Sequence, residues 1–199
     1  MSRRPNTAQR RSEIVQALLA TMADHGYEKS TIQLIAQAAG LAPGLLHYHF
    51  KTKGEILVEL VKTLAQLSQQ RYHALAANAA TPEARLHAYL NARLGKGDGA
   101  DPRAVAAWVV IGAEAVRLPE VRSVYQEAIR AEKALLEDLL GACLAERGKS
   151  LDGVAQLAAA LLAMMEGAFQ LASAAPGSMP DGYAAPMARQ LVDSHLAAN

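Results

Sequence analysis

Cysteine is almost absent from this sequence, and its scarcity limits the chemistry and the compartment that fit the protein. Cys143 is the single cysteine among 199 residues, so an internal disulfide is excluded and a reducing, cytoplasmic compartment is expected. It lies within an apolar helical pattern, which favours a small buried hydrophobe over a reactive thiol. The N-terminus lacks the pattern of a secretory signal, because Arg3 and Arg4 are followed by Pro5 and polar residues.

Long apolar runs and strand-forming residues are scarce as well. The longest apolar stretch, residues 154–172, is rich in alanine and carries Gln156, Glu166 and Gln170, so we expect a buried helix and no membrane span. Two phenylalanines, few runs of β-branched residues and abundant alanine favour helix over sheet. With no repeat and no strand-like alternation, the sequence predicts an all-α protein.

Recognisable catalytic signatures are missing too. The sequence has no phosphate-binding loop, no dinucleotide fingerprint and no nucleophile elbow. Its six histidines are scattered, and His47 and His49 lie on different faces of one expected helix, which is a poor arrangement for a shared metal ion. We therefore expect a protein that is not an enzyme and that uses no cofactor and no metal.

Charge is distributed unevenly, although the net charge is only +1. Residues 1–53 hold seven Lys or Arg against three Asp or Glu, a balance of +4, and the remaining residues have a balance of −3. The early arginines, Arg3 and Arg4 among them, either meet a phosphate near the start of the first helix or form a solvated arm. A basic head on a mildly acidic body suits a polyanionic partner for the head alone.

The most informative stretch that is present runs from Ser30 to Leu57. Apolar residues at helical spacing predict one short helix before Gly40, and Pro43 is suited to open a second. Gly40 accepts the left-handed backbone angles that a tight turn requires. Two short helices joined in this way are typical of a DNA-reading helix-turn-helix, and the alternative is an ordinary helical hairpin.

Explicit helix-start signals bound this hairpin and the helices beyond it. Ser30 with Gln33, and Thr52 with Glu55, have the spacing of a capping box. An N-cap residue followed by proline marks two further starts, Thr81-Pro82 and Asp101-Pro102. The longest predicted helices cover about residues 7–25, 53–78, 118–148 and 152–173.

The hairpin and its surroundings resemble the DNA-binding domain of the tetracycline-repressor (TetR) family of bacterial regulators. The resemblance covers about residues 10–60 and rests on Thr31-Ile32, Ile35-Ala36, Ala39-Gly40-Leu41, Gly44, Leu46, Tyr48, Phe50, Lys53 and Leu57. It implies about nine helices, with a helix-turn-helix domain over residues 1–53 and a helical regulatory and dimerisation domain over residues 54–199. Ala107-Trp108 and Leu118-Pro119 further resemble the subgroup that includes the repressor of choline-to-betaine synthesis.

Carried over by position, the resemblance implies a set of residues near double-stranded DNA: Gln33, Pro43, Gly44, Leu45, His47, Tyr48, His49 and Lys53. Lys53 would hold a phosphate, because a cation at a helix start is otherwise mildly unfavourable. The sequence departs from the family pattern at Ala42, Leu45 and His47, where Ser or Thr, Thr, and Tyr are common. The missing hydroxyls leave open a dimeric sensor or adaptor without sequence-specific DNA binding.

The later helices supply candidate residues for an effector pocket: Tyr89, Trp108, Glu114, Tyr125, Met165 and Phe169. Each of them has a simpler interpretation as part of the core. Glu114 and Glu166 stand out because a buried carboxylate needs a partner or a cationic ligand. Trp108 beside a carboxylate would suit a quaternary ammonium compound. The expected function is a repressor that a small molecule releases from its operator.

The predicted helix at residues 152–173 is apolar nearly all round, so both of its sides need cover. One side can face its own domain. In the family that the sequence resembles, the last two helices pair with those of a second subunit in a four-helix bundle. The resemblance therefore implies a homodimer, with expected interface residues Leu157, Leu161, Leu162, Met187 and Leu191.

Overall fold

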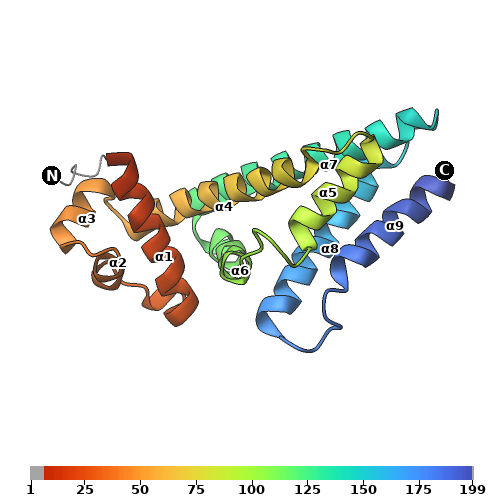
Figure 1. The fold of residues 1–199 in the computed structure, drawn as a ribbon. Coiled ribbons are helices and arrows are strands. Elements are labelled where there is room, and N and C mark those ends of the chain that lie inside the picture. Colours follow the sequence, from red (N-terminus) through yellow and green to blue (C-terminus); the bar gives the residue numbers. More distant parts are fainter. Residues whose placement is uncertain (1–6, 199) are drawn as a thin grey trace. The chain divides into compact units, whose positions relative to one another are not determined.

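The computed structural model describes residues 7–198, and within them the chain is all-helical, as the sequence predicts (Figure 1). The nine helices of this part are α1 (Thr7–Lys29), α2 (Ile32–Ala38), α3 (Pro43–His49), α4 (Lys53–Ala76), α5 (Pro82–Leu94), α6 (Pro102–Arg117), α7 (Pro119–Glu146), α8 (Val154–Ala174) and α9 (Ala184–Ala198). Arg3 and Arg4 lie outside the described residues, so their proposed phosphate contacts remain predictions.

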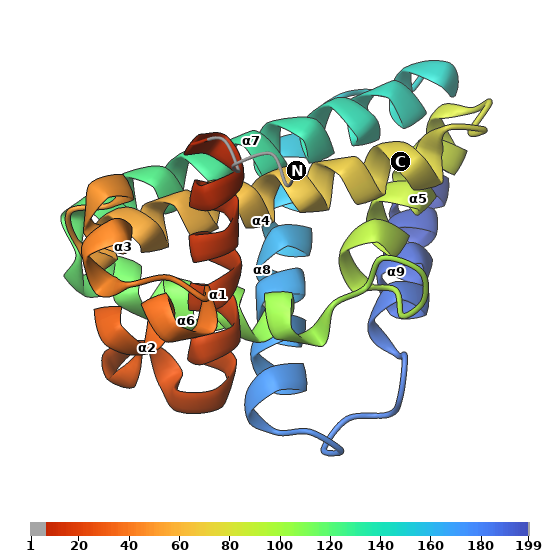
Figure 2. The same ribbon diagram turned by 60° about the vertical axis from the view of Figure 1, so that its left-hand side comes forward.

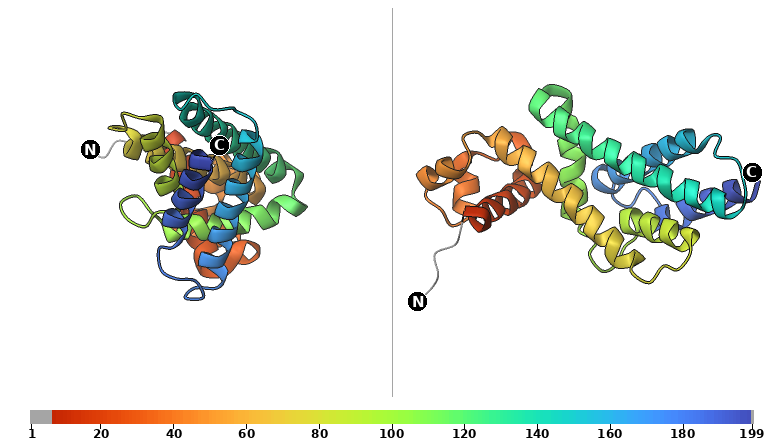
Figure 3. Two further views of the ribbon diagram at one scale, coloured as in Figure 1. Left: turned by 90° about the vertical axis from the view of Figure 1, so that its right-hand side faces the viewer. Right: turned by 90° about the horizontal axis from the view of Figure 1, so that it is seen from above.

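Two compact units divide the chain, and both are discontinuous in sequence. Unit 1 combines the residues up to Leu64 with Pro102–Gln126, and unit 2 combines Ala65–Asp101 with Glu127–Asn199. The long helices α4 and α7 each contribute residues to both units (Figure 3). Within unit 1, α6 packs against α1. The predicted domain boundary after residue 53 stays a prediction.

Unit 1 is built on a three-helix head. The apolar face predicted for α1 is buried, and α1 packs against α2 and α3 (Figure 2). Leu46 and Phe50 are buried in this unit. The helical backbone of α1 breaks at Gly26, where φ is 75°, and one further helical turn follows to Lys29. The predicted end of this helix near residue 25 therefore corresponds to a break rather than to the last helical residue.

The turn between α2 and α3 has the backbone geometry for which Gly40 was expected. Gly40 has φ 65°, its N–H donates to Gln37 O at 3.0 Å, and the N–H of Leu41 donates to Ala36 O at 2.8 Å. This pair of hydrogen bonds is the Schellman arrangement that closes a helix on a left-handed residue. Pro43 then lies at the start of α3, as predicted.

The helix caps confirm the predicted start of α5 at Thr81 but differ from the prediction at α2. Thr31, not Ser30, is the N-cap residue, and its Oγ1 accepts from Leu34 N at 3.2 Å. Ser30 instead donates to Gly26 O at 2.8 Å. At α4 the predicted residues act as expected: Thr52 Oγ1 accepts from Glu55 N at 3.1 Å, and the Glu55 carboxylate accepts from Lys51 N at 2.8 Å.

Unit 2 is organised around α5, α8 and α9, which pack on one another (Figures 1 and 2). Fully buried side chains from each helix form its core, among them Leu86, Met165 and Val192. Among the described residues, α8 is long and apolar enough to cross a membrane by length and composition, and 28% of its apolar window is buried. The prediction of a buried helix therefore holds for one side of α8 only.

Candidate DNA-binding surface and effector site

The exposed face of α3 carries most of the residues expected near DNA. Pro43, Gly44, Leu45, His47 and Tyr48 are all exposed, and the Tyr48 side chain is 73% accessible. Leu46 and Phe50 are buried, so they fix which face of α3 points outward. Ala42, at the N-cap, makes no side-chain hydrogen bond, as its missing hydroxyl implies. Unit 1 therefore presents a short helix with an unobstructed outer face.

The remaining three expected contacts differ from these in their surroundings. Gln33 on α2 is exposed, whereas His49 is half-buried and packs edge-on against Tyr48. Lys53 has partners inside the protein: its Nζ donates to Tyr27 O at 2.8 Å and to Glu28 O at 3.3 Å, and lies 4.1 Å from the Tyr27 ring centre. These contacts give Lys53 a structural role at the end of α1. Its phosphate contact stays a prediction.

Arg11 is a second basic residue that ties helices of unit 1 together. Its Nη1 donates to His49 O at 2.7 Å, and its guanidinium lies 3.9 Å from the centre of the Phe50 ring. Glu59 on α4 forms an ion pair with it at 3.6 Å. Arg11 thus positions the end of α3 from within the head.

The six expected pocket residues fall into two separate sets. In unit 1, the rings of Trp108 and Tyr125 pack at a tilt with centres 4.9 Å apart, and the buried Glu114 accepts from Arg117 at 3.0 Å. The Glu114 carboxylate therefore already has a cationic partner. In unit 2, Tyr89, Met165 and Phe169 are buried. Neither unit contains all six residues, so neither unit by itself forms the single pocket that was expected.

Tyr89 and Phe169 belong to a polar cluster inside unit 2. We name it the Arg93 cluster, and it consists of Ser68, Tyr72, Tyr89, Arg93, Glu132, Glu166 and Phe169. Arg93 lies between the two carboxylates, at 3.8 Å from Glu132 and 3.7 Å from Glu166. Its guanidinium is 5.0 Å from the centre of the Phe169 ring. One positive charge therefore faces two negative charges in a largely buried region.

Tyr89 fixes one of these carboxylates. Its hydroxyl donates to Glu132 at 2.7 Å, and its ring meets that of Tyr72 edge-on, with centres 5.8 Å apart. Burial, followed by the charge of Glu132, raises the pKa of Tyr89 far above its ordinary value. The phenol therefore stays protonated and remains a hydrogen-bond donor to Glu132.

Sequence reasoning did not select Ser68, Tyr72, Arg93 or Glu132. Glu132 had a detectable signal, because it interrupts the apolar face of α7 four residues after Ala128 and four before Leu136. A charged residue at such a position must find a buried partner. Arg93 in the last turn of α5 had no comparable signal, since a basic residue there is ordinary.

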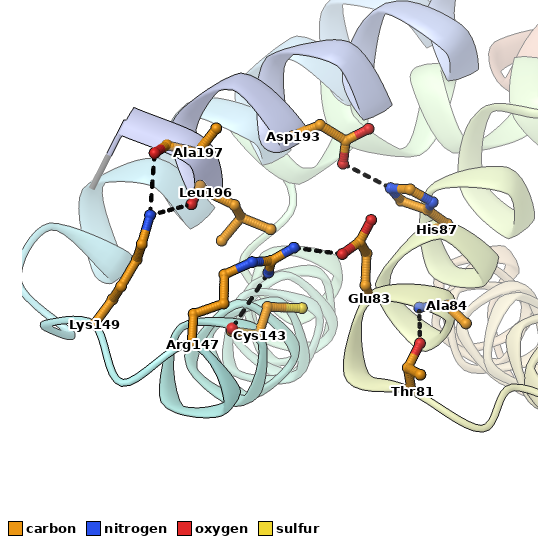
Figure 4. A network of polar contacts seen from close by, with 10 residues as sticks. All are labelled: Thr81, Glu83, Ala84, His87, Cys143, Arg147, Lys149, Asp193, Leu196 and Ala197. Carbon is orange, nitrogen blue, oxygen red and sulfur yellow. Dashed lines mark hydrogen bonds and ion pairs between the residues drawn. The ribbon is translucent and has the colours of Figure 1, made fainter.

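A second polar network links α5, α7 and α9 near the surface of unit 2 (Figure 4). His87 pairs with Asp193 at 2.8 Å, Arg147 donates to Glu83, and Lys149 donates to the last carbonyls of α9. Ligating atoms of Glu83, His87 and Asp193 lie within 4.8 Å of one another. Because Glu83, His87 and Asp193 each have a polar partner within the chain, we interpret the network as a clamp between helices.

The five expected interface residues have different exposures. Leu161 and Leu162 are buried within the chain, and Leu157 is half-buried. On α9, Met187 and Leu191 are 41% and 49% exposed and lie one helical turn apart. A substitution at Leu161 or Leu162 would therefore disturb the core of unit 2 first, so only the α9 pair offers a direct test of an interface.

The family models that match this chain cover both parts of it. Residues 14–60 match the family described as "Bacterial regulatory proteins, tetR family", and residues 82–198 match "BetI-type transcriptional repressor, C-terminal". The HTH-type transcriptional regulator BetI of Rhizobium meliloti (strain 1021) is 32% identical over 96% of this chain and 91% of its own length. The repressor KstR2 of Mycolicibacterium smegmatis is 32% identical over 40% of this chain and 38% of its own.

Solved structures share the fold at lower sequence identity. A putative transcriptional regulator of Pseudomonas aeruginosa PAO1 has a TM-score of 0.84 at 20% identity, covering 98% of this chain and 93% of its own. A putative regulator of Saccharomonospora viridis, solved in complex with choline, has a TM-score of 0.76 at 21% identity, covering 96% and 97%. The chain therefore belongs to the TetR family, as its sequence predicts: it is a ligand-responsive helix-turn-helix transcriptional repressor with a BetI-type C-terminal domain, and not an enzyme.

Proposed function

We propose that this repressor acts in the cytoplasm as a homodimer, and that a small organic cation bound at the Arg93 cluster releases it from its operator. The observation that carries the effector half is that the carboxylates of Glu132 and Glu166 and the ring of Phe169 meet around one arginine. The observation that supports the DNA half is the exposed outer face of α3.

The outer face of α3 suits the major groove of DNA. Leu45 can contact a thymine methyl, and Tyr48 and His47 reach phosphates or base edges from the same face. Gly44 adds no side chain, so the backbone can approach the DNA closely at that point. In a dimer, two such helices would enter successive major grooves about 34–36 Å apart.

The surface of α8 and α9 supports the dimer. The outward positions of α8 include Ala155, Ala159, Ala163 and Gly167, which lie one helical turn apart, and all four are exposed. Small residues in such a row let a second helix approach closely, and exposed Met187 and Leu191 on α9 add apolar area. A second copy of this surface would cover the side of α8 that the chain leaves open.

The Arg93 cluster suits a cation because it combines negative charge with aromatic faces. The two carboxylates would attract the positive group of a ligand, and aromatic rings attract cations that shed their water easily, as quaternary ammonium ions do. The regulator of similar fold that was solved with choline supports the same ligand class. Glu166, one of the two acidic residues singled out in the sequence, belongs to this cluster, whereas Glu114 does not.

One continuous helix connects the two activities within the chain. α4 begins at Lys53, directly after the recognition helix, and carries Ser68 and Tyr72 of the Arg93 cluster farther along. An effector that favours one position of α4 over another would change the energy of the DNA-binding form by its difference in affinity for the two states. This difference in affinity is what the proposed release requires.

A gel-shift assay with the DNA upstream of the protein's own gene tests the proposal. Wild type should bind in the presence of competitor DNA, and Tyr48→Ala should weaken binding at least about tenfold, since it removes a contact on the α3 face. Val116→Ala, at another exposed apolar residue, is the matched control and should bind as wild type does. Choline should release the DNA, and its uncharged carbon isostere 3,3-dimethylbutanol should not.

Three results would each contradict one part of the proposal. Absence of specific DNA binding at low salt would favour the sensor or adaptor alternative. Equal weakening by Tyr48→Ala and Val116→Ala would remove the role of the α3 face. Equal release by choline and 3,3-dimethylbutanol would show that positive charge on the effector is not recognised.

A further inference from the structure

Arg93 is a buried cation with unused hydrogen-bond donors. Its side chain is only 10% exposed, and its Nη1 donates to Ser68 Oγ at 2.8 Å. Among the described residues, neither Nε nor Nη2 has a hydrogen-bond acceptor, and both atoms are buried. Buried charged donors without acceptors are costly, so such an arrangement in a folded protein calls for a partner.

The two unused donors form a specific recognition edge. Nε and Nη2 lie on the same side of the planar guanidinium, and their N–H groups point in parallel, as two carboxylate oxygens require. A point acceptor such as a single hydroxyl would satisfy one of the two donors. The geometry of this edge therefore selects a group with two coplanar oxygens.

The neighbouring glutamates do not fill this edge. Glu132 is held by Tyr89 at 2.7 Å and by Ser68 at 3.4 Å, and it approaches Arg93 on the Nη1 side, at 3.8 Å. Glu166 lies 3.7 Å from Nη2, which is an ion-pair distance but exceeds hydrogen-bonding distance. Both carboxylates thus contribute charge to the cluster, but neither accepts a hydrogen bond from Nε or Nη2.

We propose that the effector is a zwitterion, an organic cation that also bears a carboxylate, and that the Nε–Nη2 edge of Arg93 binds that carboxylate. This inference rests on the proposed function, because the cationic group would occupy the acidic and aromatic part of the same cluster. A simple carboxylate would add a further negative charge to a region that already holds two carboxylates and one guanidinium. A zwitterion leaves the net charge unchanged while it supplies acceptors to both donors.

Four ligands of nearly identical shape distinguish recognition of the cationic group from recognition of the carboxylate. Glycine betaine carries the cation and the carboxylate, choline carries the cation and a hydroxyl, 3,3-dimethylbutyrate carries the carboxylate alone, and 3,3-dimethylbutanol carries neither. Isothermal titration of the full-length protein should give glycine betaine an affinity at least about tenfold above those of the other three, which corresponds to one good bidentate contact.

Variants of Arg93 identify the residue that reads the carboxylate. Arg93→Lys keeps the charge but loses the parallel donors, and Arg93→Gln loses both. In each variant the affinities for glycine betaine and choline should converge to within about threefold. Arg85→Gln, on the same helix at an exposed position, is the matched control and should retain the wild-type ratio. Because the readout is a ratio between ligands on one protein sample, a general loss of stability does not imitate it.

The outcomes distinguish this inference from the proposed function beneath it. The carboxylate assignment would be overturned if choline bound wild type as tightly as glycine betaine does, or if the ratio of the two affinities were unchanged in Arg93→Lys. Recognition of the cationic group would remain supported in both cases. Tight binding of 3,3-dimethylbutyrate would overturn the zwitterion and the cation together while keeping the carboxylate contact. No binding of any of the four would overturn both.

Discussion

Tyr27 shows how a single side chain joins the helices of the head. Its ring lies under the Lys53 ammonium at the end of α1 and is buried. Burial, followed by the carboxylates of Glu114, Glu120 and Glu28, raises the pKa of Tyr27 to about 12 from an ordinary value of 10.0. Its neutral phenol is therefore favoured in the folded state over the phenolate.

This shift predicts how stability depends on alkaline pH. A group whose pKa is raised on folding contributes stability below the unfolded value, so the contribution of Tyr27 should be complete at pH 9 and be lost between about pH 10 and 12. Over that window the free energy of unfolding should fall by up to about 2–3 kcal/mol more in wild type than in Tyr27→Phe. Urea unfolding at a series of pH values measures the difference. Tyr48→Phe, at an exposed ring, is the control, and parallel curves for wild type and Tyr27→Phe would refute the prediction.

The two glycines of the helix-turn-helix, Gly40 and Gly44, differ in backbone conformation and in role. Gly40 has a left-handed φ of 65° although a Cβ there would have nothing within 4 Å, so its constraint is purely conformational. Gly44 lies within α3 at a helical position that is equally open. The first glycine serves the turn, and the second serves the outer face.

Alanine at each position should separate folding from DNA binding. Gly40→Ala should lower the free energy of unfolding by about 1–2 kcal/mol, because a side chain disfavours left-handed angles. Gly44→Ala should leave stability unchanged or raise it by up to about 1 kcal/mol, since alanine favours helix, yet weaken operator binding through the added methyl on the α3 face. Thermal melts and gel shifts on both variants check this. Full DNA affinity in Gly44→Ala would show that DNA does not approach α3 closely at this point.

The elements themselves were largely predictable from local signals in the sequence. Proline starts, glycine turns and apolar spacing fix the helices because they act within a few residues, and the same signals identified the exposed face of α3. One N-cap was predicted one residue too early: Thr31 caps α2, and the expected Ser30 donates to Gly26 O instead.

The contacts that the sequence did not predict join residues that lie far apart in the chain. The ammonium of Lys53, whose phosphate contact stays a prediction, donates to carbonyls of α1 that lie more than twenty residues earlier in the chain. The Arg93 cluster draws its charged residues from α5, α7 and α8. No periodicity within one helix shows which residues of three helices meet, so the cluster required the three-dimensional structure.

At the scale of the whole molecule, the open side of α8 raises the question of what covers it. The helix is apolar enough to cross a membrane by composition, and most of its apolar window is not buried by the rest of the chain. For a DNA-binding repressor, a second copy of the chain is the cover that we propose. The adjacent side chains Met187 and Leu191 on α9 would then lie in the interface.

Substitution of these two residues tests the dimer without disturbing the core. The double variant Met187→Glu with Leu191→Glu should fold as wild type does, because both side chains are already exposed, and should sediment as a monomer, because two charges would be buried without partners at the interface. It should also bind a two-half-site operator far more weakly than wild type. Met179→Glu, at an equally exposed methionine in the loop before α9, should remain dimeric. A double variant that sediments with wild type would place the interface on another surface, and a wild type that sediments as a monomer at micromolar concentration would exclude the proposed dimer.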